Sequence, residues 1–230
     1  GLHFGETTIP VYGMAADHAE FLITHYTPEG GIILDPFMGR ATNGFACLEH
    51  GRKFIGYDVF DKNVSRTKEV MDEYYPDSDY QLFHSDGTEL AELSDKSEYL
   101  DGVVADPPYF LKCERYSTDE RDLSGMSHEE QMDKMKNCFK QIYRLIKTSN
   151  FDEKIFYPVI FKVTHARKGT RGIIDMDMEF QKIAHEVGFV TWDKLFNQLH
   201  SPWGTVNWER NYINKYVQKN YEVNLTFVKF

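Results

Sequence analysis

Short apolar runs alternate along this chain with longer segments in which apolar residues recur at helical spacing. The apolar runs predict strands at residues 31–34, 54–57, 80–83, 100–105, 155–163, 189–199 and 222–230. The helical spacing predicts helices at residues 13–25, 42–50, 61–74, 128–147 and 177–187. Strands that alternate with helices indicate an α/β fold with a mainly parallel sheet.

Turn and breaker residues mark the ends of these elements. Gly51 and Gly188 follow predicted helices, Pro76 halts another, and Pro158 predicts a bend or an irregular start in the strand at 155–163. No repeat, low-complexity tract or linker divides the 230 residues. We therefore expect a single domain over residues 1–230.

The composition narrows the class of protein. A hydrophobic content of 41% with 15% aromatic residues is typical of a globular chain. No bilayer-length apolar stretch or signal-peptide pattern occurs, so we expect a cytoplasmic protein with no membrane partner. Cys47, Cys113 and Cys138 lack paired spacing, which predicts reduced thiols and neither a disulfide framework nor a zinc site.

Four aspartates follow successive predicted strands: Asp35, Asp58, Asp86 and Asp106. In open α/β sheets, ligands bind in the crevice at the carboxyl ends of the strands, where the strand order switches. One aspartate in such a position is more often a turn residue. Because four of them recur at successive strand ends, we expect them to line one ligand site.

The loop at residues 35–42 joins the first strand to a helix. Gly39 permits close approach of the backbone to a ligand, and the helix N-terminus attracts an anionic group. The segment lacks both the three glycines of a dinucleotide site and the Gly-Lys-Ser/Thr of a P-loop, which argues against NAD and ATP. Asp58 stands where an acid commonly binds both ribose hydroxyls of an adenosine-containing ligand. Asp86 could accept a hydrogen bond from an adenine amino group or form an Asp-Gly turn, and both readings stay open.

The tetrapeptide Asp106-Pro107-Pro108-Tyr109 ends the apolar run at residues 100–105. The prolines cannot donate to a sheet ladder, so the strand must end there. Their fixed φ aims the Asp106 carboxylate and the Pro107 carbonyl into the crevice beyond the strand. A planar ring with an amino group would find two acceptors there, with the Tyr109 ring as a stacking platform.

Together these segments resemble the S-adenosylmethionine-dependent amino-methyltransferases that act on exocyclic amines of adenine or cytosine in DNA. The tetrapeptide is similar to their catalytic motif, and residues 35–42 are similar to their Asp-Pro-Phe-x-Gly-x-Gly-Thr cofactor loop. Residues 8–22 are similar to the element beside the methionine part of the cofactor. The resemblance covers nearly the whole chain. It implies a doubly wound, mostly parallel seven-stranded sheet with an antiparallel edge strand and no large separate recognition domain.

The resemblance also assigns roles. It implies S-adenosylmethionine as cofactor, S-adenosylhomocysteine as product and no metal, with residues 1–99 mainly binding the cofactor and residues 100–230 supplying catalysis and nucleic-acid contacts. The implied catalytic residues are Asp106, Pro107, Pro108 and Tyr109, and the implied cofactor-binding residues are Thr8, Pro10, Asp35, Pro36, Phe37, Gly39, Ala41, Thr42, Asp58 and Asp86. One departure is Ala41, which replaces the family's second glycine and is costly only if φ there is positive.

The implied reaction is methyl transfer to the N6 amino group of adenine in DNA, on a base flipped out of the duplex. An acid at the first motif position favours adenine, by resemblance, whereas a cytosine-N4 methyltransferase is the nearest alternative. A non-catalytic DNA-binding subunit of a methyltransferase complex is the alternative from another class.

DNA contacts are expected from local basic and aromatic segments, because the net charge of −10 argues against a generally basic coat protein. The segment 162–172 carries cations without an acid, the segment 210–219 interleaves cations with tyrosines, and the loop at 201–212 contains two tryptophans. Ordinary solvated loops are an equally supported interpretation. The expected DNA-contacting residues are Arg167, Lys168, Arg171, Trp203, Arg210 and Tyr212. Either the loops near 110–127, 165–175 and 200–221 read DNA unaided, with a short or degenerate sequence preference, or a fused domain, a partner subunit or a homodimer supplies sequence recognition. Restriction-modification is the expected setting.

Overall fold

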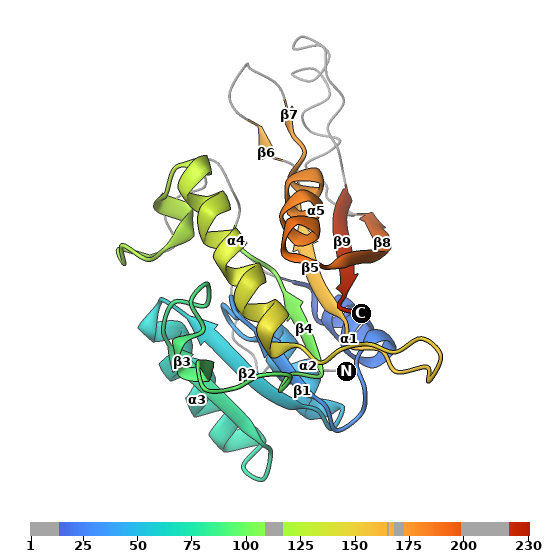
Figure 1. Cartoon of the computed structure of the whole chain (residues 1–230). Helices are drawn as coiled ribbons and strands as arrows, with labels where there is room; N and C mark the ends of the chain where they lie inside the picture. The colour runs from blue at the N-terminus through green and yellow to red at the C-terminus, as the bar shows by residue number, and fades with distance from the viewer. Residues whose placement is uncertain (1–13, 109–116, 165, 168–172, 199–220) are drawn as a thin grey trace.

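The computed structural model of the chain describes residues 14–108, 117–164, 166–167, 173–198 and 221–230 (Figure 1). The strands are β1 (Ile32–Asp35), β2 (Lys53–Asp58), β3 (Tyr80–His84), β4 (Gly102–Ala105), β5 (Val159–Val163), β6 (Ala166–Arg167), β7 (Ile173–Ile174), β8 (Val190–Gln198) and β9 (Tyr221–Val228). The helices are α1 (Ala16–Tyr26), α2 (Thr42–Glu49), α3 (Asp61–Tyr74), α4 (His128–Leu145) and α5 (Met176–Val187), with short 3₁₀ turns η1 (Ala91–Leu93) and η2 (Leu123–Gly125). Every predicted helix and every predicted strand is present within a few residues of its expected bounds.

One seven-stranded sheet organises the molecule, in the order β3-β2-β1-β4-β5-β9-β8. Strands β3, β2, β1, β4 and β5 pair in parallel, whereas β9 is antiparallel to both β5 and β8. The predicted seven-stranded, mostly parallel sheet with antiparallel pairing at one edge is therefore confirmed. The chain order reverses between β1 and β4, so the switch point of the sheet lies at their carboxyl ends.

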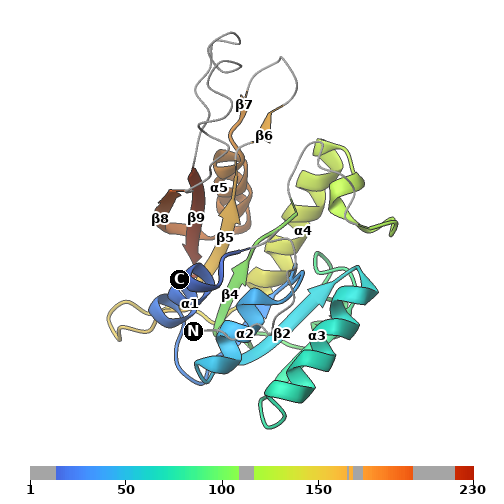
Figure 2. The same ribbon diagram turned by 180° about the vertical axis from the view of Figure 1, so that it is seen from behind.

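Helices cover both faces of the sheet. Figure 1 shows α4 and α5 in front of the strands, and the reverse view in Figure 2 brings α1, α2 and α3 to the front. The larger of the two buried apolar clusters lies on the α4–α5 face, and the other lies on the α1–α2–α3 face. The sheet is thus doubly wound, as the alternation of strands and helices predicts.

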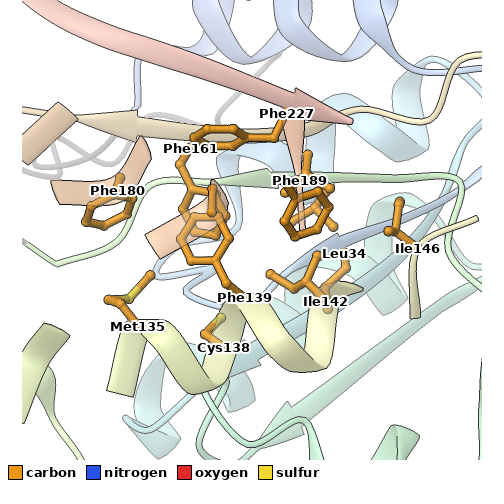
Figure 3. Close-up of a cluster of buried hydrophobic side chains, with 14 of the residues drawn as sticks. Leu34, Met135, Cys138, Phe139, Ile142, Ile146, Phe161, Phe180, Phe189 and Phe227 are labelled. Carbon is orange, nitrogen blue, oxygen red and sulfur yellow. The ribbon is translucent and has the colours of Figure 1, made fainter. Parts of the chain in front are cut away.

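Aromatic rings form the centre of the larger core. Phe139 of α4 packs against Phe161 of β5 with ring centroids 4.7 Å apart, and it meets Phe180, Phe189 and Phe227 edge-on (Figure 3). Edge-to-face contacts between buried rings are among the preferred aromatic arrangements. This cluster anchors α4 and α5 to β5 and β9, and so fixes β5, which flanks β4, together with β9 on the far side of β5.

Local signals explain where the helices begin and end. Ser127 and Glu130 form a capping box at the start of α4, which satisfies two of the free backbone N–H groups there. Gly188 ends α5 in the left-handed conformation, with φ of 116°. The terminal glycine was recognised in the sequence, which is why the end of α5 is predicted closely, whereas the capping box of α4 was not.

The structure differs from the prediction at β5 and at three short elements. The fifth strand begins at Val159 instead of residue 155, because Pro158 can accept a ladder hydrogen bond from Val103 but cannot donate one. The β6–β7 pairing and the two 3₁₀ turns were not predicted, since segments this short carry too little periodicity. None of the described helices is both long and apolar enough to cross a membrane.

Candidate active site

The carboxyl ends of β1, β2 and β4 bring three of the predicted acids to one edge of the sheet. Asp35 and Asp58 are the last residues of β1 and β2, and Asp106 follows β4 directly. Because β1 pairs with both neighbours in parallel, these strand ends lie side by side at the switch point. The structure therefore gathers Asp35, Asp58 and Asp106 as the sequence predicts.

Asp35 is buried, with 2% of its surface exposed, and neutral groups bind both of its oxygens. Oδ1 accepts a hydrogen bond from the Phe37 N–H at 3.0 Å, and Oδ2 accepts one from Asn43 Nδ2 at 2.8 Å. Burial raises the pKa of Asp35 to about 7, and the two hydrogen bonds oppose that rise. Asp35 thus holds the cofactor loop to the start of α2.

The loop between β1 and α2 turns through two left-handed residues. Gly39 has φ of 51°, and Ala41 has φ of 57° and is fully buried. For an alanine this conformation costs about 1–2 kcal/mol relative to the right-handed region. Because φ is positive, the replacement of the family's second glycine by Ala41 carries this cost in free energy. The loop nevertheless forms the turn that a glycine would form more easily. Phe37 packs partly buried against the larger core, and Thr42 begins α2.

Gly87 brings the loop after β3 against the same turn. A Cβ built on Gly87 would lie 1.8 Å from the Pro36 carbonyl oxygen, so only glycine permits this approach. The adjacent Asp86 is engaged within the protein: Oδ1 accepts from the Thr88 N–H at 2.8 Å, and Oδ2 pairs with Lys134 Nζ at 3.0 Å. The turn role of Asp86 is thus realised, and a contact to the cofactor stays a prediction.

Asp58 is half-buried, which suits a group that meets a bound ligand. Its oxygens accept hydrogen bonds from the Phe60 N–H at 2.7 Å and from Asn63 Nδ2 at 3.2 Å. Burial raises the pKa of Asp58, and hydrogen bonds, including one from the Gly39 backbone, oppose the rise. A carboxylate retains further lone pairs for a ligand beyond these two bonds.

Asp106 lies beside a buried ammonium group. Oδ2 of Asp106 is 2.8 Å from Lys162 Nζ, and the same nitrogen is 3.3 Å from Glu222 Oε2. Lys162 is 3% exposed, whereas 17% of the Asp106 side chain remains exposed toward the strand end. Burial raises the pKa of Asp106 to about 6, and the charge and hydrogen bond of Lys162 limit the rise. Pro107 is buried and Pro108 is half-buried, and neither belongs to the strand.

Four residues of the site were not predicted: Asn43, Gly87, Lys162 and Glu222. Asn43 Nδ2 joins Asp35 to the Val104 carbonyl oxygen at 3.2 Å, and so ties β1 to β4. Lys162 was expected in a basic surface segment, and that expectation is wrong, because the side chain is buried against two acids. A single lysine inside the apolar run of β5 is the signal that could have revealed it, since an unpaired lysine is almost never fully buried.

Several predicted residues lie outside the described part of the chain. Arg167 lies in β6, and its side chain is not described. The others are Thr8, Pro10, Tyr109, Lys168, Arg171, Trp203, Arg210 and Tyr212, together with Cys113. Cys47 and Cys138 are free and buried. Among the described residues, no group of three or more His, Cys, Asp or Glu side chains could hold a metal ion.

The sequence matches a known protein family over the first part of this site. Residues 14–69 match the family model described as DNA methylase, which includes N6 and N4 amino-methyltransferases. Over these residues, the chain resembles the DNA methylases. The match spans α1, the cofactor loop and Asp58, and it ends before Asp86 and Asp106. The resemblance seen in the sequence is therefore confirmed for the first part of the site. No curated protein matches the sequence.

Solved structures extend the likeness over the remaining chain, at the level of fold. The [4+2]-cyclase SpnF superposes with a TM-score of 0.63 at 12% identity and covers 93% of this chain and 81% of its own. A TehB-like S-adenosylmethionine-dependent methyltransferase from Corynebacterium glutamicum gives 0.52 at 16% identity, with 92% and 87% covered. An S-adenosylmethionine-dependent methyltransferase from Methanosarcina mazei gives 0.57 at 12% identity, with 91% and 97% covered. The fold is that of the methyltransferases, and a cyclase among these proteins shows that the fold alone does not decide the reaction.

Proposed function

We propose that this chain transfers a methyl group from S-adenosylmethionine to the N6 amino group of adenine in DNA, on a flipped-out base. One observation carries the proposal: a half-buried acid followed by two prolines stands directly beside the loop that matches the DNA methylases. Asn43 hydrogen-bonds to Asp35 on one side and to Val104, two residues before Asp106, on the other. The amine acceptor and the cofactor loop are thereby held together at the switch point.

The described residues fit this cofactor. The left-handed turn at Gly39 and Ala41 bends the loop back toward the sheet, and Asp58 offers a half-buried carboxylate at the next strand end for two ribose hydroxyls. When bound, S-adenosylmethionine supplies an activated methyl group on its sulfonium and leaves as S-adenosylhomocysteine. The protein therefore needs neither a covalent nucleophile nor a metal, and its task is to position and activate the amine.

Asp106 and Pro107 would perform that task. The target nitrogen donates its two N–H bonds to the Asp106 carboxylate and the Pro107 carbonyl, which frees its lone pair from the ring. As the new N–C bond forms, the bonding electrons of the old S–C bond return to sulfur and positive charge develops on nitrogen. The carboxylate stabilises that charge, and it is the nearest acceptor for the proton that the nitrogen then loses. Alignment of nitrogen, methyl carbon and sulfur supplies much of the remaining acceleration.

DNA enters the proposal through the family match and through the geometry of the reaction. A base inside a duplex cannot reach an acid at a strand end, so the nucleotide must be extruded, and Tyr109 would stack on it. The expected phosphate and base contacts are Arg167, Lys168, Arg171, Trp203, Arg210 and Tyr212. A fused domain, a partner subunit or a second copy of the chain would supply sequence recognition.

Transfer of labelled methyl groups onto unmodified DNA tests the proposal, with mass spectrometry of the digested DNA to identify the product. We expect N6-methyladenine, and we expect Asp106→Ala to lower the rate by about 100-fold or more. Asp95→Ala is the matched control, because Asp95 is an exposed acid that pairs with its neighbour Lys96. That variant should keep the wild-type rate.

Other outcomes would change the assignment. N4-methylcytosine as the product would replace adenine by cytosine and leave the site intact. Full activity in Asp106→Ala would remove Asp106 from catalysis. An absence of S-adenosylmethionine binding in calorimetry would favour the non-catalytic subunit.

A further inference from the structure

Lys162 is the most deeply buried cation of the site and lies between two acids. It comes from β5, the strand between β4, which carries Asp106, and β9, which carries Glu222. Its ammonium group contacts Asp106 Oδ2 at 2.8 Å and Glu222 Oε2 at 3.3 Å. Glu222 is itself buried, with 6% of its surface exposed. Lys162, Asp106 and Glu222 together form a charge triad.

Strand register places the triad on one face of the sheet. Ala105 pairs with Phe161, so Asp106 comes level with Lys162 where β4 ends. Phe161 belongs to the aromatic core beneath α4 and α5, and the alternation of a strand turns Lys162 to the opposite face, beneath α1. Rigid strands rather than loops therefore set the separation of the three charges.

A buried charge triad of this kind is a poor way to stabilise a fold. Replacement of buried ion pairs by apolar residues of similar volume is often neutral or stabilising, so burial of three charges favours a role in specificity or function. The unequal exposure of the triad agrees, since 17% of the Asp106 side chain is exposed, against 3% for Lys162 and 7% for Glu222, and Asp106 is thus the member most open to a ligand. With two carboxylates and one ammonium group ionised, the triad carries one net negative charge.

Among the described residues, the groups around the triad leave that charge uncancelled. His18 of α1 contacts Asn197 Nδ2 through Nδ1 at 2.7 Å and Asn224 Nδ2 through Nε2 at 3.1 Å. Burial and the charge of Lys162 lower the pKa of His18, which keeps the imidazole neutral at neutral pH. A further titratable neighbour in the described part of the chain is Asp35, whose charge interacts with that of Asp106 across the switch point.

We propose that Lys162 is a positioning residue that fixes Asp106 as an ionised acceptor, with Glu222 as the anchor for the ammonium group. Lys162 binds Oδ2 of Asp106, and Oδ1 would receive the N–H of the target amine. Glu222 holds Lys162 in place from the far side, and its charge keeps the triad negative while the amine becomes positive. This inference rests on the proposed methyl transfer.

Removal of Lys162 changes the chemistry of Asp106 in a defined direction. Burial and the charge of Glu222 both raise the pKa of Asp106, and Lys162 opposes them. Without the ammonium group, Asp106 would hold its proton at higher pH and become a donor instead of an acceptor. Each unit of that rise lowers the ionised fraction about tenfold at pH values below the pKa.

The experiment compares Lys162→Met and Lys162→Arg with a matched control, Lys147→Met. Lys147 Nζ lies 2.6 Å from Asp101 Oδ1 and so neutralises an acid at the opposite end of β4. The readouts are the pH profile of kcat, the Kd for S-adenosylmethionine, and the titration of the Asp106 carboxyl carbon by NMR, assigned by its loss in Asp106→Asn.

For Lys162→Met we expect the acid limb of the kcat profile and the Asp106 titration to move up by about one pH unit or more. The Kd should change less than about twofold, because no cofactor contact is removed. Lys162→Arg should restore most of the wild-type profile, and Lys147→Met should leave it unmoved. Unchanged titration of Asp106 in Lys162→Met would overturn the proposal.

Two further measurements keep the test decisive. If Lys162→Met does not fold, the double variant Lys162→Met/Glu222→Gln removes the uncompensated second acid, and it should still show the raised Asp106 titration. If the wild-type protein methylates no DNA, the proposed function fails, whereas the NMR titration still decides whether Lys162 sets the ionisation of Asp106.

Discussion

Asp35 and Asp106 occupy equivalent places at the ends of neighbouring strands, yet different partners hold them. Neutral donors bind Asp35, namely the Phe37 N–H and the Asn43 amide. A buried ammonium group binds Asp106, and a second acid stands behind it. Burial raises the pKa of Asp35 to about 7 and that of Asp106 to about 6.

The protonation state of a buried carboxyl group therefore depends on its hydrogen-bond or ion-pair partner as well as on its burial. Neutral donors only partly offset the loss of solvent, so Asp35 takes up a proton near neutral pH and serves as a structural acceptor. A cation offsets more of that loss, so Asp106 remains ionised at neutral pH. Four experiments test this contrast between the two acids.

The largest expected effect is a fall in the free energy of unfolding as pH rises. Asp35 should contribute more to this fall than Asp106. The folded-state pKa of Asp35 lies above the ordinary value, so the folded protein binds this proton more tightly than the unfolded chain. Stability should therefore be greatest below the ordinary carboxyl pKa, fall as pH rises, and level off above about 7, with a loss of at most about 4 kcal/mol.

Urea denaturation at a series of pH values checks this slope in wild-type protein, Asp35→Asn and Asp106→Asn. Asp35→Asn should remove the larger share of the slope, because its pKa is raised further. An equal dependence of the unfolding free energy on pH in Asp35→Asn and the wild type would show that Asp35 is ionised in the folded protein. The contrast between Asp35 and Asp106 would then be wrong.

Gly87→Ala should separate the loop after β3 from the cofactor loop. The new Cβ would lie 1.8 Å from the Pro36 carbonyl oxygen, a backbone atom that cannot rotate away. We expect a loss of about 3 kcal/mol in the free energy of unfolding and weaker binding of S-adenosylmethionine. Gly30→Ala is the control, because no atom lies within 4 Å of its new Cβ, and its φ of 72° makes the substitution costly through the backbone alone. Similar losses in both variants would contradict the close approach.

Asn43→Ala should weaken the hydrogen bonding of Asp35 and leave the ion pair of Asp106 unchanged. It removes the donor to Asp35 Oδ2 and to the Val104 carbonyl and leaves two buried acceptors without it. We expect a loss of about 2 kcal/mol in unfolding experiments. Asn63→Ala removes the 3.2 Å bond to the half-buried Asp58 and should lose about half as much. A larger loss in Asn63→Ala would contradict the role given to burial.

Ala41→Gly should give the smallest effect, and it should be a gain. The left-handed φ of 57° suits glycine better than alanine, although glycine loses more entropy on folding. We expect an increase of about 0.5–1 kcal/mol in unfolding free energy, measured by urea denaturation, with tighter cofactor binding in calorimetry. A decrease would show that packing of the buried methyl group outweighs the backbone strain.

The sequence predicted the elements well because their signals are local. Gly51, Pro76 and Gly188 stop helices by their own backbone chemistry, and the order of apolar runs indicates a parallel sheet whatever the distant contacts. The strand-end acids were found in the same way, since Asp35, Asp58 and Asp106 each follow an apolar run.

The partners of those acids were not predicted, and β9 shows why. Glu222 and Asn224 alternate with Val223 and Leu225, a pattern typical of a strand with one face in water. In the structure β9 pairs with β5 inside the sheet, and Glu222 and Asn224 are both buried. The alternation of polar and apolar residues shows which residues share a face of the strand. It does not show whether solvent or other parts of the protein cover that face.

The residues that end each strand, and hence the acids at the candidate site, could be predicted from the local sequence. Only the tertiary structure decided that Asp35 meets Asn43, that Gly87 touches Pro36, and that Lys162 lies between Asp106 and Glu222. The physical reason is that strand ends are set by neighbouring residues along the chain. The charges around an acid are set by strand order and register, which join β4, β5 and β9 across more than a hundred residues of sequence.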